Sequence, residues 1–119
     1  MAGQITHIDI PADDIERAKG FYRAVAGWEI GPVPGFEDYE MFRTGEASGG
    51  GIGIRGKTAP DQLRIYITVD RLEDAVAAAQ RAGGSLAVPP ADVPGQGRYA
   101  AVTDTEGNEV GLWEAARES

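Results

Sequence analysis

Residues 5–27 read ITHIDIPADDIERAKGFYRAVAG, and this stretch contains the signals of a strand and of the helix that follows it. Its first six residues predict a β-strand of period two with one buried face, because His7 and Asp9 share one face and Ile8 and Ile10 the other. The apolar residues that follow recur at helical spacing. Asp13, with Glu16 three residues later, predicts a capped helix start, and Gly27 predicts the helix end, where a residue that tolerates positive φ is favoured. The stretch is therefore predicted to be a strand followed by a helix.

The same pattern returns 57 residues later, as the step from His7 to Arg64 shows. The matched pairs include Ile8 with Ile65, Asp13 with Asp70, Glu16 with Glu73, and Gly27 with Gly84. The second copy therefore predicts a strand at 63–69 and a helix that Asp70 and Glu73 cap. Three short strands are predicted after each helix, at 28–33, 39–44 and 50–54 in the first copy and at 85–88, 98–103 and 109–114 in the second.

Two copies of strand, helix and three strands predict an α+β protein of two βαβββ modules. Residues 1–56 form the first module and residues 62–119 the second, joined by the polar segment 56–62 that contains Pro60. Neither module alone has a second layer large enough to cover its sheet, so the modules must pair, within one chain or between chains. We expect residues 1–119 to be a single domain.

The composition excludes several classes of function. Eleven Lys and Arg against 19 Asp and Glu give a net charge of −8, which repels phosphate backbones and anionic membranes. Nucleic acid is therefore not an expected partner. No apolar run approaches the ~20 residues of a transmembrane helix, and the N-terminus has no signal-peptide pattern. The absence of cysteine excludes disulfides, thiolate metal sites and cysteine nucleophiles, and we expect a cytoplasmic protein.

Paired βαβββ modules of this length, with Phe21 and Tyr22 inside the first helix, resemble the vicinal oxygen chelate superfamily. This superfamily includes glyoxalase I, extradiol dioxygenases and bleomycin-resistance proteins. The resemblance covers the whole chain, and within the superfamily the chain is similar to a glyoxalase-like subgroup. This similarity rests on residues 7–14, 16–18, 21–22, 27–29, 49–52, 66–70, 88–90, 94–95 and 97–99. It implies a cup-shaped mixed sheet of two half-barrels with the helices on the outer face, and it implies a homodimer.

Alternation along the strands separates an aliphatic face, which belongs under the helices, from a mixed polar and aromatic face. The mixed face is expected to line a small-molecule pocket in the cup. Its candidate residues are His7 and Asp9 for catalysis, and Arg64, Tyr66, Thr68, Tyr99 and Trp113 for ligand binding. A buried Arg64 needs a counter-charge, which either a carboxylate such as Asp9 or Glu109 or an anionic ligand supplies.

Metal-dependent members of this superfamily resemble one another in placing His or Gln on the first strand of each module and Glu on its last strand. Those positions fall on His7, Arg64, Gly53 and Gly111. Arginine is always cationic and glycine has no side chain, so only His7 can bind a metal, and no cofactor is expected. A displaced divalent metal site formed by His7, Asp9 and Glu109 is the weaker alternative.

The leading interpretation is a metal-independent, glyoxalase-like protein that binds a small aromatic or carboxylated molecule. The alternative is an enzyme of the lyase, isomerase, cyclase or dioxygenase type. In its metal-free version His7 is the general base, oriented by Asp9, while Arg64 and Tyr66 stabilise an oxyanion. In its metal version the displaced site holds the ion. The glycine run at 49–51 lacks the lysine and following helix of a phosphate loop, and we expect it to allow close backbone approach instead.

Overall fold

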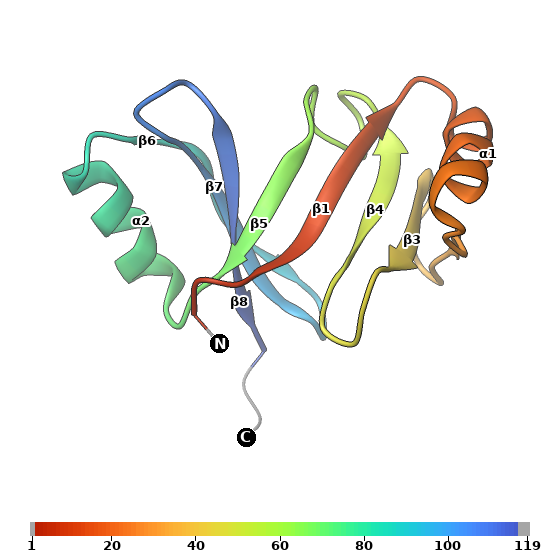
Figure 1. Ribbon diagram of the computed structural model, residues 1–119. Helices are drawn as coiled ribbons and strands as arrows, with labels where there is room; N and C mark the ends of the chain where they lie inside the picture. The colour runs from red at the N-terminus through yellow and green to blue at the C-terminus, as the bar shows by residue number, and fades with distance from the viewer. Residues whose placement is uncertain (1, 117–119) are drawn as a thin grey trace. The chain divides into compact units, whose positions relative to one another are not determined.

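The computed structural model describes residues 2–116, which fold as α+β with the element order βαβββ repeated twice (Figure 1). The first copy comprises β1 (Ile5–Ala12), α1 (Ile15–Ala26), β2 (Gly31–Pro32), β3 (Tyr39–Arg43) and β4 (Gly49–Ile54). The second comprises β5 (Arg64–Thr68), α2 (Leu72–Arg81), β6 (Ser85–Val93), β7 (Gly97–Thr103) and β8 (Glu109–Ala115). The described chain divides into an N-terminal unit, residues 6–64, and a C-terminal unit, residues 2–5 and 65–116. The predicted repeat of two βαβββ modules is confirmed.

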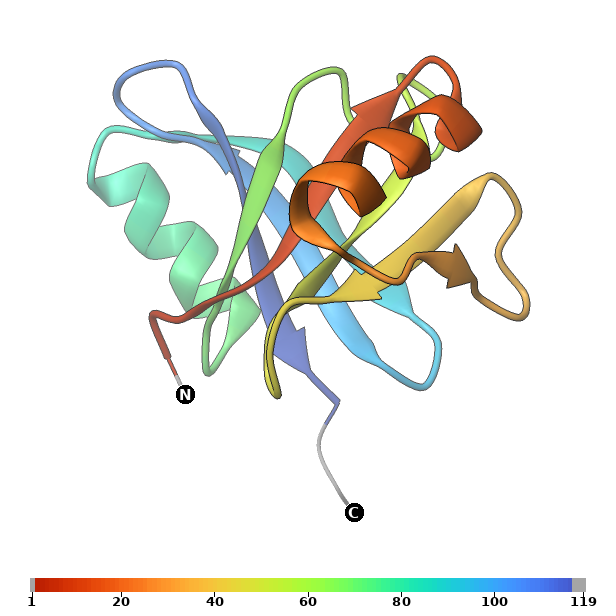
Figure 2. The ribbon, with the colours of Figure 1, turned by 45° about the vertical axis from the view of Figure 1, so that its right-hand side comes forward.

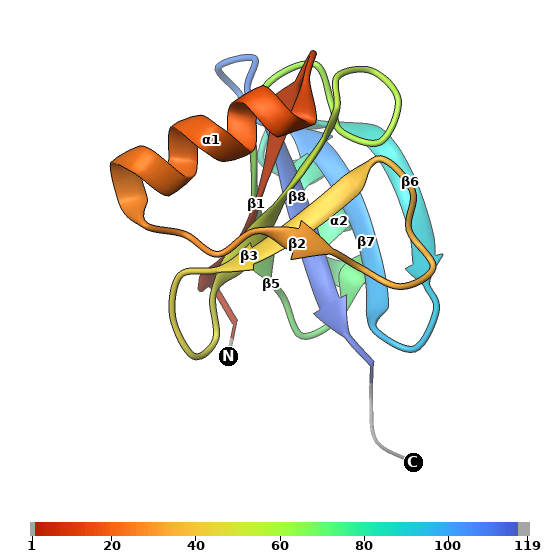
Figure 3. The ribbon, with the colours of Figure 1, turned by 90° about the vertical axis from the view of Figure 1, so that its right-hand side faces the viewer.

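In the N-terminal unit the strands run in the order β2, β3, β4, β1, with β1 parallel to β4 and the other pairs antiparallel. Figure 2 shows α1 along one face of these strands, and Figure 3 shows β2 beside β3. Ile10, Phe42 and Ile52 form the buried core, against which Ile8 and Tyr22 pack. The predicted aliphatic face of β1 therefore lies under α1.

The helix α1 begins one residue later than the sequence predicts. Asp14, and not Asp13, is the N-cap, because its Oδ1 accepts a hydrogen bond from the backbone N–H of Arg17 at 3.0 Å. Since β1 continues to Ala12, the side chain of Asp13 turns away and accepts from Nε of Arg55 at 3.0 Å. The predicted helix end at Gly27 is confirmed, with a left-handed φ of 70°.

In the C-terminal unit the strands run in the order β5, β8, β7, β6, with β5 parallel to β8 and the other pairs antiparallel. Leu72 and Val76 of α2 pack with Ala100 and Leu112 in the core of this unit. Neither α1 nor α2, the helices of the described residues, is long and apolar enough to span a membrane.

The helix α2 begins one residue later than the sequence predicts from Asp70. The N-cap is Arg71, whose side chain makes no capping hydrogen bond, and the backbone N–H of Leu72 donates instead to Oε1 of Glu114 on β8 at 2.7 Å. A residue from 42 positions later in the chain therefore satisfies the helix end, and local spacing carries no signal for such a contact.

The strand β6 runs to Val93, through Pro89 and Pro90, where the sequence predicts a strand that ends at residue 88. Among the described residues this strand pairs with β7 alone, and its register shifts between Val88 and Ala91. Proline lacks an N–H, so an edge strand with an irregular register is where it is tolerated. Conversely, the strand predicted at 28–33 is reduced to Gly31–Pro32.

Candidate functional site

Three polar side chains of the N-terminal unit hydrogen-bond to one another, and we call them the His7 cluster: His7, Asp9 and Tyr39. Nε2 of His7 lies 3.0 Å from Oδ1 of Asp9 and 2.9 Å from the hydroxyl oxygen of Tyr39. The Tyr39 hydroxyl donates to the same Oδ1 of Asp9 at 2.6 Å. The side chains of His7 and Asp9 are 27% and 12% exposed, so the group is half-buried rather than solvated.

Alternation along β1 places His7 and Asp9 on the face opposite Ile8 and Ile10, which pack in the core with α1. The cluster therefore belongs to the face that the sequence assigns to the pocket. The predicted contact between His7 and Asp9 is present. Sequence reasoning did not include Tyr39, because it lies 30 residues from Asp9 on a different strand.

The missing side chain of Gly51 allows Tyr39 to reach Asp9. On β4, Gly51 pairs with Asp9 on one side and Met41 on the other, and Tyr39 pairs with Gly53. A Cβ at Gly51 would lie 2.0 Å from Cζ and from the hydroxyl oxygen of Tyr39. The Tyr39 ring therefore crosses β4 over Gly51. At Gly49 and Gly50 a Cβ would instead meet backbone oxygens at 2.3 Å, the close approach expected for this run.

The turn after β4 hydrogen-bonds to Asp38, the residue that precedes Tyr39. Asp38 has a left-handed φ of 55°, which is uncommon for a residue other than glycine. Its carbonyl accepts a hydrogen bond from the hydroxyl of Thr58, and its carboxylate accepts from Nζ of Lys57 at 2.5 Å. The carboxylate of Asp38 raises the pKa of Lys57 through this hydrogen bond. Asp38 is thus fixed in a conformation that directs Tyr39 toward β4.

The two glycines at the metal-ligand positions implied by the resemblance have neighbours where a side chain would go. A Cβ at Gly53 would lie 2.8 Å from the carbonyl oxygen of Thr58, and a Cβ at Gly111 would lie 2.2 Å from Cδ2 of Tyr66. In the arrangement present, neither position has room for a glutamate. With Arg64 cationic at the third position, the residues present do not fit the metal site of the superfamily.

The displaced metal site draws on both units, because Glu109 lies on β8 whereas His7 and Asp9 lie on β1. Among residues 2–116, no group of three or more His, Asp or Glu side chains is placed to hold a metal ion. The displaced site stays a prediction.

The predicted ligand-binding residues of the C-terminal unit lie on its face opposite α2. Tyr66, only 6% exposed, has its ring over Gly111 and 6.2 Å from the ring of Tyr99. Trp113 pairs with Tyr99 on β7 and with Thr68 on β5, so these three side chains form one row. Arg64, the last residue of the N-terminal unit, is buried at the start of β5. A ligand role for these residues stays a prediction.

An ion-pair group that changes the acidity of Glu73 lies at the start of α2. Arg98 on β7 donates to both carboxylate oxygens of Glu73 at 2.7 Å, and to Oε1 of Glu114 at 3.3 Å. The hydrogen bonds from Arg98 lower the pKa of Glu73 to about 2. This ion-pair group joins α2 to β7 and β8, and we assign it to stability rather than to ligand handling.

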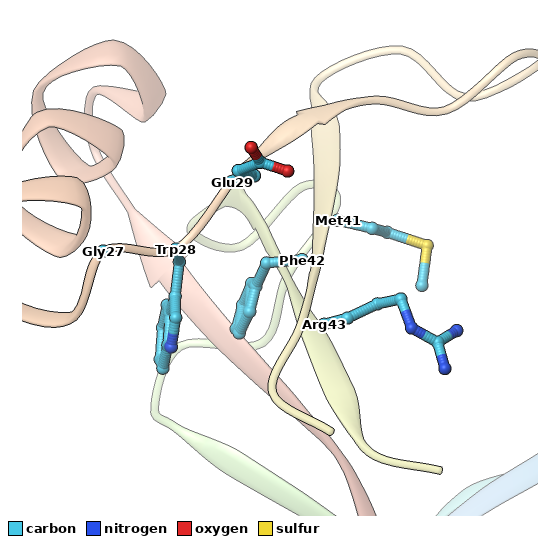
Figure 4. Close-up of a pocket in the computed structure, with 6 residues that line it drawn as sticks. All are labelled: Gly27, Trp28, Glu29, Met41, Phe42 and Arg43. Carbon is cyan, nitrogen blue, oxygen red and sulfur yellow. The ribbon is translucent and has the colours of Figure 1, made fainter. Parts of the chain in front are cut away.

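A surface hollow of about 520 Å³ lies in the N-terminal unit between the end of α1 and β3 (Figure 4). Its lining includes Trp28 and Phe42, whose rings stack at 4.1 Å. Trp28 also stacks with Tyr22, at 5.2 Å. Met41 and Arg43 point away from these rings in Figure 4. Because the aromatic faces pack with one another, we assign no ligand to this hollow.

Comparison with known proteins identifies the relatives of this chain. The family described as "Bleomycin resistance protein-like N-terminal" matches residues 4–45. The chain is 32% identical over 117 residues to "Putative glyoxylase CFP32" of Mycobacterium tuberculosis, across 92% of this chain, and it spans 45% of that relative's length. It is 33% identical over 91 residues to a "Glyoxylase-like domain-containing protein" of Didymella fabae, across 71% of each chain.

Solved structures with the same fold are more distant in sequence. A glyoxalase/bleomycin resistance protein/dioxygenase superfamily member from Vibrio splendidus matches with a TM-score of 0.68 at 12% identity, over 96% of this chain and 99% of the other. Methylmalonyl-CoA epimerase from Mycobacterium tuberculosis matches with a TM-score of 0.65 at 16% identity, over 97% and 89%. These structures share the fold, and the 33% identity across 71% of the Didymella fabae relative shows the family: the chain belongs to the glyoxalase, bleomycin resistance and dioxygenase superfamily, also called the vicinal oxygen chelate superfamily.

Proposed function

We propose that this protein binds a small organic molecule at the His7 cluster without the metal that the superfamily uses. The observation that carries the proposal is the hydrogen-bonded group of His7, Asp9 and Tyr39, set on the strand face opposite α1. Half-buried polar groups with fixed orientation are what a small-molecule site uses to recognise a ligand. The misfit of Gly53 and Gly111 to metal ligation supports a metal-independent site.

The surroundings of the cluster indicate the class of ligand. The ring of Phe36, on the loop before β3, lies 6.4 Å from the ring of Tyr39 and is 48% exposed. An exposed aromatic ring beside fixed hydrogen-bonding groups favours a molecule with a planar or apolar part and a polar substituent. An aromatic or carboxylated compound has this character.

A metal-free enzyme is the second candidate function, and the contact between His7 and Asp9 favours it. A carboxylate that holds an imidazole at 3.0 Å orients the ring and stabilises its protonated form, as a general base requires. The reaction class is proton abstraction next to a carbonyl group, which underlies isomerases and some lyases. Such proton transfer needs no cofactor when a base is positioned by its neighbours.

The binding proposal is tested with protein that has been treated with chelator and dialysed. A panel of small aromatic and carboxylated compounds is screened by saturation-transfer NMR, and the dissociation constant of each binder is then measured. We expect binding to persist in chelator and to weaken at least about tenfold in Asp9→Asn, which removes the charge of a partly buried hydrogen-bonding group. Tyr22→Phe, which deletes a hydroxyl elsewhere in the same unit, is the matched control. Binding that requires an added divalent metal contradicts the proposal.

The enzyme candidate is tested with the same binders in D₂O. A base that removes a proton next to a carbonyl group exchanges it for deuterium, which mass spectrometry detects without knowledge of the product. Exchange that survives chelator and disappears in His7→Ala supports the metal-free enzyme. Intact binding without any exchange leaves a binding protein and rejects this candidate.

The homodimer and the cytoplasmic location expected from the sequence remain part of the proposal. Sedimentation equilibrium of the purified chain measures the first: a mass of twice 12.6 kDa supports a homodimer, and a mass of 12.6 kDa contradicts it.

A further inference from the structure

We infer that Tyr39 is a positioning residue for His7 and that the neutral ring of His7 carries its proton on Nε2. This inference rests on the proposed function only in assigning a proton-handling role to the site. Its structural content, which is where the protons of the His7 cluster lie, is independent of any ligand.

The positions of the protons follow from counting donors. A neutral tyrosine has one hydroxyl proton, and Tyr39 donates it to Oδ1 of Asp9. The Tyr39 oxygen can then only accept from Nε2 of His7, and an ionised Asp9 can only accept. Both short contacts of Nε2 are therefore satisfied by one N–H shared between two oxygens. With the proton on Nε2, the lone pair of the neutral ring is on Nδ1.

Tyr39 and Asp9 have different parts in this arrangement. Asp9 supplies the charge that attracts the imidazole N–H, but an aspartate side chain can rotate. The Tyr39 hydroxyl donates to the same oxygen at 2.6 Å, which holds that oxygen toward His7, and it also provides the second acceptor. The phenol therefore fixes both the carboxylate and the ring. Because it acts through these groups, Tyr39 is a positioning residue.

Gly51 is the sequence feature that makes this role possible. The 2.0 Å separation between a Cβ at Gly51 and the hydroxyl oxygen of Tyr39 excludes the observed ring position for any other residue there. Gly53 contributes in turn, because it leaves room for the turn whose Thr58 donates to the carbonyl of Asp38, immediately before Tyr39. Gly51 and Gly53, both on β4, therefore leave the space that the position of Tyr39 requires.

The experiment uses the fact that His7 is the only histidine of the chain. In ¹⁵N-labelled protein in alkaline buffer, where an imidazole is neutral, the one pair of ring nitrogens is assigned without ambiguity. We expect Nε2 to be protonated and Nδ1 unprotonated. We also expect the Nε2–H proton to be protected from exchange with water. A ring protonated on Nδ1 overturns the inference.

Tyr39→Phe tests the positioning role, with Tyr22→Phe as the matched control in the same unit. We expect the exchange of the Nε2–H proton to accelerate about fivefold or more in Tyr39→Phe, since one acceptor and the anchor of Asp9 are lost, and to be unchanged in Tyr22→Phe. Unchanged exchange in Tyr39→Phe overturns the positioning role. Circular dichroism verifies that both variants are folded.

Gly51→Ala provides a second test in which the phenol is kept but displaced. We expect it to reproduce the faster exchange of Tyr39→Phe, whereas Gly20→Ala, where a Cβ meets nothing within 4 Å, leaves the exchange unchanged. If Gly51→Ala does not fold, the Tyr39→Phe result alone decides. A protected Nε2–H with no binder in the panel rejects the proposed function and leaves this inference standing. An Nε2–H that is not protected, together with a binder in the panel, rejects the inference and leaves the proposed function standing.

Discussion

Gly111→Ala is expected to destabilise the protein because the ring of Tyr66 occupies the space that the new methyl group needs. The Cβ would lie 2.2 Å from Cδ2 and 2.4 Å from Cε2 of that ring. The ring is buried, so it moves only by disturbing its neighbours, and overpacking of this kind costs about 1–3 kcal/mol. Replacing a strand glycine by alanine returns about 0.5–1 kcal/mol. The net loss of unfolding free energy is therefore about 0.5–2 kcal/mol.

A double-mutant cycle isolates the contact. Tyr66→Ala alone is expected to cost about 3–5 kcal/mol, as for other buried aromatic residues. With the ring absent, Gly111→Ala has nothing to displace and adds about 0.5–1 kcal/mol of stability. The two substitutions should therefore be non-additive by about 1–3 kcal/mol, the range found for side chains in contact.

The assay is urea denaturation followed by far-ultraviolet circular dichroism, on the wild type, the two single variants and the double variant. Gly20→Ala is the control for the intrinsic effect of replacing glycine by alanine. If Gly111→Ala is as stable as the wild type, or if the two substitutions add within about 0.5 kcal/mol, the ring of Tyr66 does not occupy this position.

Three further substitutions test the fold. Gly20→Ala should raise the unfolding free energy by about 0.5–1 kcal/mol, because Gly20 lies inside α1 at a φ suited to alanine with nothing within 4 Å; a loss on urea denaturation contradicts this. Asp14→Ala should lower it by about 1 kcal/mol and Asp13→Ala by less, since only Asp14 caps α1; equal losses reject this assignment. Glu73→Gln tests the ion pair with Arg98. Because the pKa of Glu73 is lowered to about 2 in the folded protein, its stabilisation is complete above pH 4.5 and lost as the pH falls toward 2. The wild type should therefore exceed Glu73→Gln in urea midpoint at pH 6, with the difference closing by pH 2; a difference independent of pH refutes the assignment.

The repeat and the strand faces could be predicted from the sequence, because both rest on local spacing. Ile8 and Ile10 lie under α1, and Gly27 ends that helix, as their spacing indicates. The helix starts were wrong at both copies. At α1 the error is one residue, from Asp13 to Asp14, and at α2 the cap comes from Glu114, which is distant in sequence.

The candidate site was predicted only where its members share a strand. His7 and Asp9 are two residues apart on β1, so alternation alone brings them together. Tyr39 joins them across β4, and its signal in the sequence was the absence of a side chain at Gly51. A glycine in a strand indicates that something approaches closely, but it does not identify the neighbour. The structure supplies that identity: a tyrosine ring at Gly51 and another at Gly111.

The most direct test of metal-independent binding at the His7 cluster is an NMR titration in the presence of chelator. A binder from the compound panel is added to ¹⁵N-labelled protein, and the ring signals of the single histidine are followed. We predict that these signals shift with saturation at the dissociation constant of the binder, and that Asp9→Asn weakens binding at least about tenfold. Binding that leaves the histidine signals unmoved, or that appears only after a divalent metal is added, contradicts it.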